Sequence, residues 1–331
     1  MLEDKLEIII ITYNRKKYLQ RTLEKLLEDS SPVKNLSITI LDNNSTDETG
    51  EYLDELSKKY NNVKHIANKY NVGGNANFAK AVELAESEYF WILGDDDLLD
   101  FSNWSEVESA LNNNYDMVFM ASKQYEEQIE RIFKEFPQFE KSKDKEYIIK
   151  GILAAHFIFI SSSIYKKSIV DDLVMRNIYD TTCTMCPQSA LFCKILNEER
   201  PYYVLKNGGI VYWGCCDDDV SYTRGYDKHE LNPRSTKITF FAGVANALEI
   251  LKDKKLKKYV MSYFFDYTKC AKHLYTIVKS DLRLYNQTPY NIADLIMLAP
   301  AYYKFMLILG FLPCAVLMVW DKLRGKIKNV K

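Results

Sequence analysis

Apolar runs alternate with segments of helical periodicity along the first hundred residues of this chain. Residues 7–12 are apolar at nearly every position, which is typical of a strand buried on both faces of a parallel sheet. Leucines between residues 19 and 27 then recur at the spacing of one helix face. This alternation predicts an α/β fold with a mostly parallel central sheet and helices on both faces. We expect strands at residues 7–12, 36–42, 63–67 and 89–93, and helices at 19–27, 45–60 and 76–85.

Polar side chains follow three of the predicted strands, at the point where each strand ends. They form the clusters Thr12–Arg15, Asp42–Ser45 and Gly94–Asp97. Because such sheets bind ligands beyond the carboxyl ends of their strands, the clusters predict a nucleotide site at one edge of the sheet. No G-x-G-x-x-G or G-x-x-x-x-G-K-[ST] sequence occurs at this edge, so phosphate binding has to rest on a metal and on side chains.

Three consecutive carboxylates, Asp95, Asp96 and Asp97, close the fourth predicted strand. Adjacent anions repel one another, so folding alone would not favour this triplet at the mouth of a buried strand. A divalent cation removes that objection, and hard oxygen ligands suit Mg²⁺ or Mn²⁺. The alternative is a turn whose acids point into water.

The other two clusters offer contacts for the nucleotide base. Tyr13 can stack on a flat ring, or it can pack over the end of the sheet. Asp42 can accept a hydrogen bond from the N3–H of uracil, or it can cap a helix. Ser45 and Glu48 have the spacing of a capping box, which favours the first role for Asp42. The loop at residues 71–77 either brings amides against the nucleotide or only turns the chain.

Together these motifs resemble family 2 glycosyltransferases of GT-A fold. The matching segments are Thr-Tyr-Asn-Arg at residues 12–15, Asp-Asn-Asn-Ser at 42–45, the asparagine–glycine loop at 71–77, and Gly-Asp-Asp-Asp at 94–97. The pattern is most similar to bacterial surface-polysaccharide enzymes, including abequosyltransferase-like ones. It spans residues 5–125 and, less closely, residues 150–215.

The resemblance implies a nucleotide-diphosphate sugar donor, expected to be a UDP-sugar, and a divalent cation, Mn²⁺ or Mg²⁺. The usual metal ligand of the family then matches Asp96, with Asp97 in support and Asp95 directed to the ribose or to a metal-bound water. Many members have an acid where this chain has Gly94. By motif, the donor-binding residues are Thr12, Tyr13, Asn14, Arg15, Asp42, Asn71, Gly74, Asn77, Asp95 and Asp96, and the metal ligands are Asp96 and Asp97.

The resemblance also implies inversion at the anomeric carbon, which requires a general base on the acceptor side. Family members often place a Glu-Asp pair at the start of a helix, but the corresponding helix here begins near Gln188 without an acid. We expect Asp180 to be the base, with Asp217 and Asp218 as competing candidates. Asp180 can equally be a turn residue, and Asp217 and Asp218 can belong to a solvated loop.

Net charge and cysteine content indicate the partners and the cellular compartment to expect. The net charge of −1 over 331 residues gives no reason to expect a nucleic-acid partner. The seven cysteines are odd in number and none lies in the first half of the chain, which favours free thiols in a reducing cytosol. Cys183 and Cys186 have zinc-site spacing, but Cys215-Cys216 is no matching second pair.

The last forty residues are apolar and then basic. Residues 305–320 carry no charge, but a membrane-spanning helix needs about 20 apolar residues. We expect a GT-A domain at residues 1–235, a helical extension at 236–290, and membrane-associating helices with a basic tail at 291–331. This arrangement favours attachment to the cytoplasmic face of a bacterial inner membrane. The alternatives are a buried helical hairpin or a dimer contact through these helices.

The expected function is an inverting glycosyltransferase that extends a lipid-linked glycan in bacterial polysaccharide synthesis. One alternative is a non-catalytic relative that binds sugar nucleotide as a partner subunit, since the Glu-Asp pair is missing. A phosphohydrolase is the least favoured alternative, because no Asp-x-Asp-x-Thr nucleophile motif occurs in the sequence.

Overall fold

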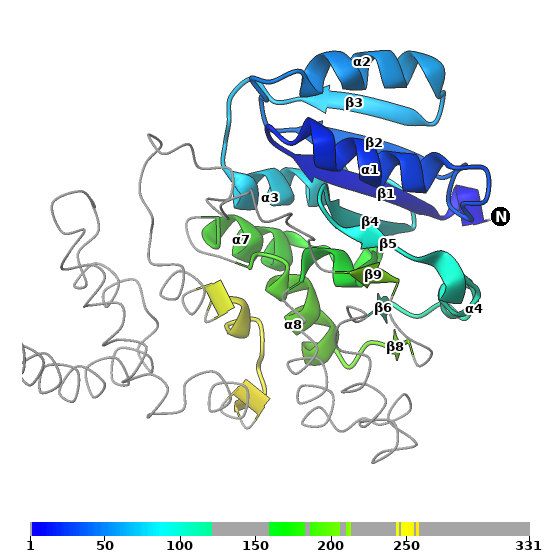
Figure 1. The fold of residues 1–331 in the computed structure, drawn as a ribbon. Coiled ribbons are helices and arrows are strands. Elements are labelled where there is room, and N and C mark those ends of the chain that lie inside the picture. The colour runs from blue at the N-terminus through cyan, green and yellow to red at the C-terminus, as the bar shows by residue number, and fades with distance from the viewer. Residues whose placement is uncertain are drawn as a thin grey trace, which may run out of the picture.

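The computed structural model describes residues 2–120, 159–182, 186–205, 210–212, 243–244, 246–254 and 256–257 (Figure 1). The strands of these ranges are β1 (Leu6–Thr12), β2 (Ser37–Asp42), β3 (Val63–Ala67), β4 (Tyr89–Gly94), β5 (Leu98–Leu99), β6 (Met117–Phe119), β7 (Ser163–Lys166), β8 (Tyr202–Val204) and β9 (Val211–Tyr212). The helices are α1 (Lys16–Leu27), α2 (Thr49–Lys59), α3 (Gly74–Leu84), α4 (Trp104–Asn112), α7 (Asp172–Asp180) and α8 (Ser189–Asn197).

Seven of the described strands form one mixed sheet in the order β3-β2-β1-β4-β7-β6-β8. The strands β3, β2, β1 and β4 run parallel to one another, and β8 runs parallel to β6. The strand β7 is antiparallel to both of its neighbours, β4 and β6. A separate pair, β5 and β9, lies outside this sheet. The mostly parallel sheet is therefore as predicted, with one reversed strand in its second half.

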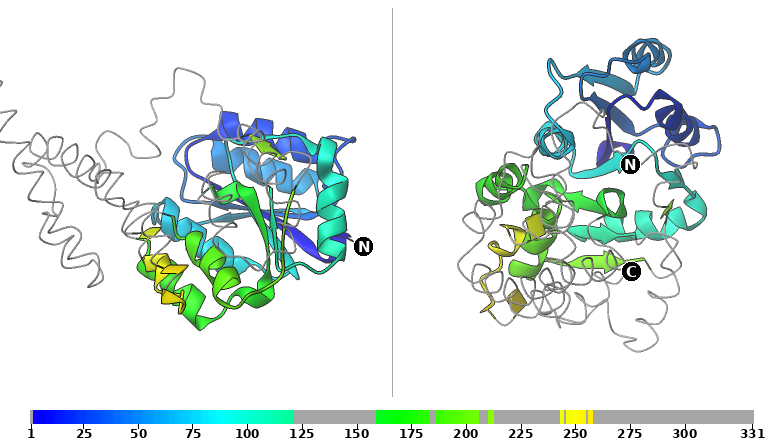
Figure 2. Two further views of the ribbon diagram at one scale, coloured as in Figure 1. Left: turned by 90° about the horizontal axis from the view of Figure 1, so that it is seen from below. Right: turned by 60° about the vertical axis from the view of Figure 1, so that its left-hand side comes forward.

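Helices cover both faces of the sheet, as the two views in Figure 2 show. Ile8 and Ile10 of β1 belong to the core cluster that includes α1, α2 and α4. Ile9, between them, belongs to the opposite cluster with α3, α7 and α8. Successive side chains of a strand point to opposite faces, so a strand covered on both sides has to be apolar throughout. All three isoleucines are fully buried.

The predicted strands at 7–12, 36–42, 63–67 and 89–93 agree with β1 to β4 within one residue at each end. The predicted capping box of Ser45 and Glu48 is wrong. α2 begins only at Thr49, and its N-cap residue, Glu48, makes no side-chain cap. The Ser45 hydroxyl donates to Asp42 instead, and Asp47 Oδ1 accepts from the Thr49 amide at 3.0 Å. The local spacing was right for a cap, but the serine is held by the preceding strand.

Part of the chain after residue 236 packs onto α7 and α8. Val244, Leu248 and Leu251 are buried in the same core cluster as α7 and α8. Asn177 Nδ2 of α7 donates to the Asn246 carbonyl at 2.6 Å. Within the described ranges, the structure contains no helix with both the length and the apolarity needed to cross a bilayer. The predicted membrane segment at 291–331 lies outside those ranges.

Candidate functional site

The ends of β1, β2 and β4 meet at one edge of the sheet. In the register, Thr12 lies opposite Asp42 of β2, and Ile11 lies opposite Gly94 of β4. The three polar clusters therefore converge as predicted, because β1 is the central strand of the three. Tyr13 follows directly at this edge and is partly exposed.

The acidic turn after β4 is tied to β1 and α1. Thr12 Oγ1 donates to Asp95 Oδ2 at 2.6 Å, and Arg15 Nη1 donates to Asp95 Oδ1 at 3.1 Å. The Thr22 hydroxyl of α1 donates to the Asp95 carbonyl at 2.9 Å. Asp95 is only 4% exposed, and burial raises its pKa to about 6 against the opposing charge of Arg15. Asp95 is thus bonded within the protein, and its predicted role toward the ribose or a metal-bound water stays a prediction.

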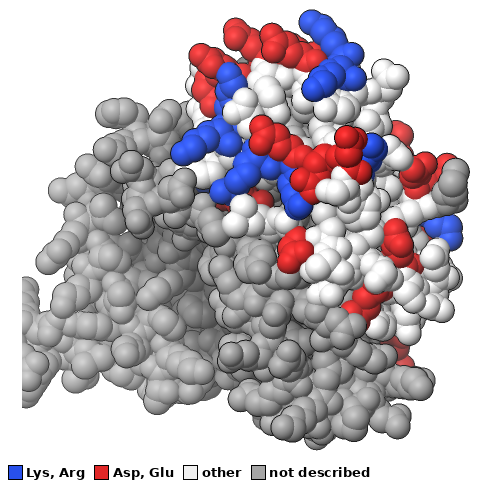
Figure 3. All heavy atoms as spheres, turned by 45° about the vertical axis from the view of Figure 1, so that its right-hand side comes forward, with Lys and Arg blue, Asp and Glu red and all other residues white. Residues whose placement is uncertain are grey.

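The charge of the acidic triplet is balanced in part by an arginine. Arg15 Nη1 lies 2.8 Å from Asp96 Oδ2 as well as 3.1 Å from Asp95 Oδ1. A guanidinium is always charged and presents several donors, so it can bridge two carboxylates. Arg15 therefore offsets part of the repulsion within the triplet, and the predicted cation is not the only positive charge available to it. In Figure 3, basic side chains also lie beside acidic ones over the upper, described part of the face that is shown.

Asp96 is the acid of the triplet that remains open to a ligand. Its side chain is 19% exposed, against 5% for Asp95, and its backbone is fixed by Arg21, whose Nη2 donates to the Asp96 carbonyl at 2.7 Å. Among the described residues, no three His, Cys, Asp or Glu side chains are placed to hold a metal ion together. Mg²⁺ or Mn²⁺ can nevertheless be bound by one carboxylate when phosphate oxygens and water supply the remaining ligands. Asp96 therefore fits the group that the motif implies.

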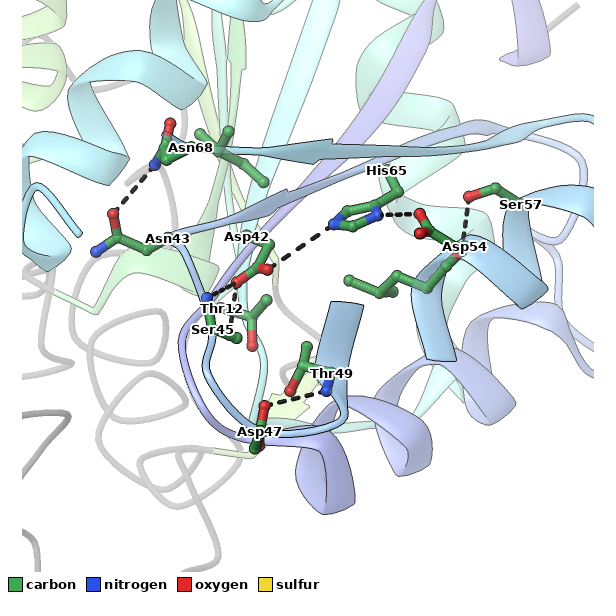
Figure 4. Close-up of polar contacts among 12 residues, drawn as sticks. Thr12, Asp42, Asn43, Ser45, Asp47, Thr49, Asp54, Ser57, His65 and Asn68 are labelled. Carbon is green, nitrogen blue, oxygen red and sulfur yellow. Dashed lines mark hydrogen bonds and ion pairs between the residues drawn. The ribbon is translucent and has the colours of Figure 1, made fainter. Parts of the chain in front are cut away.

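Asp42, at the end of β2, is bonded within the protein. Its Oδ1 accepts from the Ser45 amide at 3.0 Å and from the Ser45 hydroxyl at 2.5 Å (Figure 4). The residue is only 2% exposed. The carboxylate thus shapes the turn after β2, at the same edge of the sheet where Tyr13 follows β1.

Asparagine side chains hold the loop between β3 and α3. Asn43 Nδ2 donates to Asn71 Oδ1 at 2.8 Å, and Asn68 Nδ2 donates to Asn77 Oδ1 at 2.7 Å. Asn77 Nδ2 donates in turn to the Leu41 carbonyl at 3.1 Å. Asn77 is 2% exposed and uses both ends of its amide within the protein, so it helps to position the loop, and its predicted contact with the nucleotide stays a prediction. Gly74, at the start of α3, borders open space and stays available to a ligand.

Comparison with known proteins identifies the family. The model of glycosyl transferase family 2 matches residues 7–174, about half of the chain. This chain belongs to glycosyl transferase family 2. The GalNAc(5)-diNAcBac-PP-undecaprenol beta-1,3-glucosyltransferase of Campylobacter jejuni is 27% identical over 322 residues, which cover 97% of each chain. The resemblance seen in the motifs is thereby confirmed.

Two solved structures share the fold. S. aureus TarS 1-349 in complex with UDP-GlcNAc matches with a TM-score of 0.59 and 16% identity, over 92% of this chain and 84% of that one. The mannosyltransferase PcManGT from Pyrobaculum calidifontis, in complex with GDP-Man and Mn²⁺, has a TM-score of 0.53 and 14% identity. That match covers 96% of this chain and 88% of PcManGT. The GT-A-like arrangement of a mixed sheet between helices is thus established.

This chain has Gly94 where many family 2 members have an acid, and the surroundings of Gly94 leave little room for a side chain. A Cβ at Gly94 would lie 3.0 Å from Asp97 Oδ2 and 3.4 Å from Asp96 Oδ1. The Asp97 carboxylate also accepts a short hydrogen bond from Ser161, whose hydroxyl accepts from the Gly94 amide at 2.9 Å. Asp97 is only 2% exposed and braces the turn through Ser161, and its predicted role at the metal stays a prediction.

Replacing Gly94 by alanine is expected to reduce the free energy of unfolding by about 1–3 kcal/mol, because the new methyl group crowds the Asp97 carboxylate. Urea unfolding measures this change. Gly50→Ala is the matched control: its Cβ meets nothing within 4 Å in α2, and alanine is the better helix former. Equal effects of the two substitutions would contradict the steric explanation.

The candidate bases are only partly within the described structure. Asp180 is exposed and is the last residue of α7. Two residues later, the Thr182 carbonyl accepts from Asn75 Nδ2 of α3 at 3.5 Å, so the end of α7 lies beside the start of α3. α8 begins at Ser189 after Gln188, without an acid, as expected. Asp217 and Asp218 lie outside the described residues.

Sequence reasoning missed several residues that build the site. Thr22 and Ser161 bond the acidic turn, Asn43 and Asn68 bond the loop before α3, and His65 faces Asp42. One signal was available: Thr22 lies on the same buried face of α1 as Leu19, Leu23 and Leu26. A polar side chain on such a face needs a partner, which here is the acidic turn.

Proposed function

We propose that this chain is an inverting glycosyltransferase that moves a sugar from a UDP-sugar to a hydroxyl of a lipid-linked glycan. The observation that carries the proposal is the convergence of three strand ends at one edge, with the Asp96 carboxylate partly exposed there. Membership of glycosyl transferase family 2 supports the reaction class. The names of the C. jejuni relative and of the TarS complex support the acceptor class and the donor class.

The donor would bind across this edge. Tyr13 would lie against the base and the turn at Asp42 beneath it, while Asp96 would hold Mn²⁺ or Mg²⁺ against the diphosphate. The cation would supply positive charge that neutralises the departing nucleotide diphosphate. Arg15, already within 2.8 Å of Asp96, would keep that carboxylate oriented and add a second positive charge.

The acceptor hydroxyl requires a base on the other side of the reacting carbon. We propose Asp180, because its carboxylate is exposed and the chain beyond it contacts α3 near the donor edge. Asp217 and Asp218 remain the competing candidates. Because Gln188 stands where other members carry an acid, a second candidate function is that of a partner subunit that binds sugar nucleotide without transferring it.

A lipid-linked acceptor would explain the basic, apolar end of the chain. We propose that residues 291–331 attach the enzyme to the cytoplasmic face of a bacterial inner membrane, where such acceptors are assembled. Anionic headgroups attract clusters of Lys and Arg, and the tail carries five of them after residue 320. Dimerisation through the same helices is the alternative use of this segment.

Thermal unfolding with nucleotide panels tests the donor assignment. UDP-sugars with Mn²⁺ are expected to raise the midpoint by about 5 °C at concentrations far above Kd, since a ligand of the native state stabilises it. GDP-sugars are the matched control and are expected to give a smaller shift. Equal stabilisation by UDP-sugars in excess chelator would count against the role of Asp96.

A further inference from the structure

A histidine on β3 lies between two carboxylates directly beneath the donor edge. His65 Nδ1 lies 2.8 Å from Asp54 Oδ1 of α2, and Nε2 lies 3.9 Å from Asp42 Oδ2 of β2 (Figure 4). In the register, His65 pairs with Ile40 of β2, two residues before Asp42. β2 and α2 are the elements packed most extensively against β3. Asp42 and Asp54 are the charged groups that these two elements place against the ring.

Two of these three side chains, those of His65 and Asp42, are largely shielded from solvent. The side chains of His65 and Asp42 are 10% and 4% exposed, whereas that of Asp54 is 67% exposed. His65 Nε2 is a buried nitrogen without a hydrogen-bond partner among the described residues, and it faces Asp42. At 3.9 Å the attraction between the two is electrostatic rather than a hydrogen bond. A buried carboxylate without a countercharge is costly, and the protonated form of this imidazole would supply that charge.

The other oxygen of Asp42 supports the loop that carries the donor residues of β1. Asp42 Oδ1 accepts from Ser45, and Ser45 Oγ accepts from the Asn14 amide at 2.8 Å. Asn14 Oδ1 accepts from the Thr46 amide at 2.6 Å, with Asn14 in the left-handed region at φ 52°. A continuous set of contacts therefore runs from His65 through Asp42 and Ser45 to the residue between Tyr13 and Arg15.

We propose that His65 is a positioning residue for donor binding: its protonated form holds Asp42, and through Ser45 it fixes the Tyr13–Arg15 loop in the arrangement that accepts the nucleotide diphosphate. The proposal rests on the proposed function of this edge. The positive charge also lowers the electrostatic cost of bringing an anionic diphosphate near Asp42. His65 touches no donor atom in this role and acts through Asp42.

The direction of the pH dependence follows from the surroundings of His65. The carboxylate of Asp42, with that of Asp54, raises the pKa of His65 above 6.5 against the opposing effect of burial. The stabilising charge is therefore fully present below pH 6.5 and is lost as the pH rises through the raised pKa. Donor affinity is expected to fall over the same interval.

Calorimetric titration of UDP with Mn²⁺ from about pH 5.5 to about pH 8.5 tests the proposal. The dissociation constant of the wild-type chain is expected to rise with pH by about threefold to tenfold more than that of His65→Gln, because a pKa shift of one unit on binding corresponds to a tenfold change. Protonation of UDP itself contributes equally to the pH profiles of both proteins, so the comparison between them cancels it. Parallel pH profiles would overturn the proposal.

Asp54→Asn is a second variant that leaves the buried residues intact. Removing this exposed carboxylate is expected to move the pH midpoint of UDP binding to lower values, and an unchanged midpoint would also overturn the proposal. Lys64→Gln removes an exposed charge from the adjacent residue of β3 and is expected to keep the wild-type profile. A change of profile in Lys64→Gln as large as in His65→Gln would show that any positive charge on β3 has the effect, and would overturn the specific role of His65.

Imidazole NMR separates this inference from the proposed function. The pKa of His65 is expected to fall in Asp42→Asn, whether or not UDP binds, because its nearest buried carboxylate is gone. An unchanged pKa would overturn the pairing of His65 with Asp42. Absence of UDP binding at every pH, with this pKa change present, would overturn the proposed donor instead.

Discussion

Replacing Asp96 by asparagine is expected to lower sugar transfer about 10²–10³-fold, because the amide cannot supply the charged oxygen that a hard divalent cation prefers. Asp96 is the most exposed acid of the turn, and its neighbours Asp95 and Asp97 are held inside the protein. The loss is therefore not expected to be replaced by either of them. Transfer of sugar from a UDP-sugar to a lipid-linked acceptor, followed at several Mn²⁺ concentrations, measures the effect.

Two further variants show which step is lost. Asp180→Asn is expected to keep metal-dependent UDP binding while losing transfer, because a base acts on the acceptor and not on the donor. Asp29→Asn removes an equally negative but fully exposed side chain, and is expected to preserve both activities. Unchanged transfer in Asp96→Asn would contradict the proposed metal site. Wild-type UDP binding without transfer to any acceptor would favour the partner-subunit function.

Replacing Arg15 by methionine is expected to lower the free energy of unfolding by about 2–4 kcal/mol. The substitution leaves the buried Asp95 carboxylate without its countercharge, which costs more than the loss of a surface ion pair. The Arg15 side chain is itself 24% exposed, so the expected loss lies at the low end for a buried pair. Urea unfolding in the presence of chelator measures it.

The matched control for Arg15→Met is Lys34→Met. Lys34 pairs with Asp29, whose side chain is fully exposed, so this change is expected to leave the free energy of unfolding nearly unchanged. The double variant Arg15→Met, Asp95→Asn is expected to recover part of the loss, because the unpaired charge is gone. If Arg15→Met were no more damaging than Lys34→Met, the role of Arg15 as countercharge would be refuted.

Much of the fold was predictable from local patterns. The apolar run of residues 7–12 specifies a doubly covered strand, since each of its successive side chains has to be buried on one face or the other. The leucines of α1 mark one helix face in the same way. The reversed direction of β7 was not predictable, because its four-residue sequence carries no mark of direction.

The location of the candidate site was predictable from the sequence, but its hydrogen bonds and ion pairs were not. Strand order follows from topology rules, so the sequence indicated that Thr12, Asp42 and the acidic turn share one edge. Spacing suggested a capping box at Ser45 and a cation among the three acids. The structure gives Ser45 to Asp42, and it adds Arg15 as a positive charge beside two of the three acids, which spacing did not indicate.

The sequence by itself determined the alternation of strands and helices, the edge at which polar residues gather, and the family to which the motifs belong. Only the tertiary structure decided which acid of the turn is exposed, which asparagine amides are hydrogen-bonded within the protein, and that His65 faces Asp42. The reason is distance along the chain: Thr12 bonds Asp95 across 83 residues, and Ser161 bonds Asp97 across 64. Periodicity reports burial within one element, whereas partners such as these are fixed only when separate elements pack together.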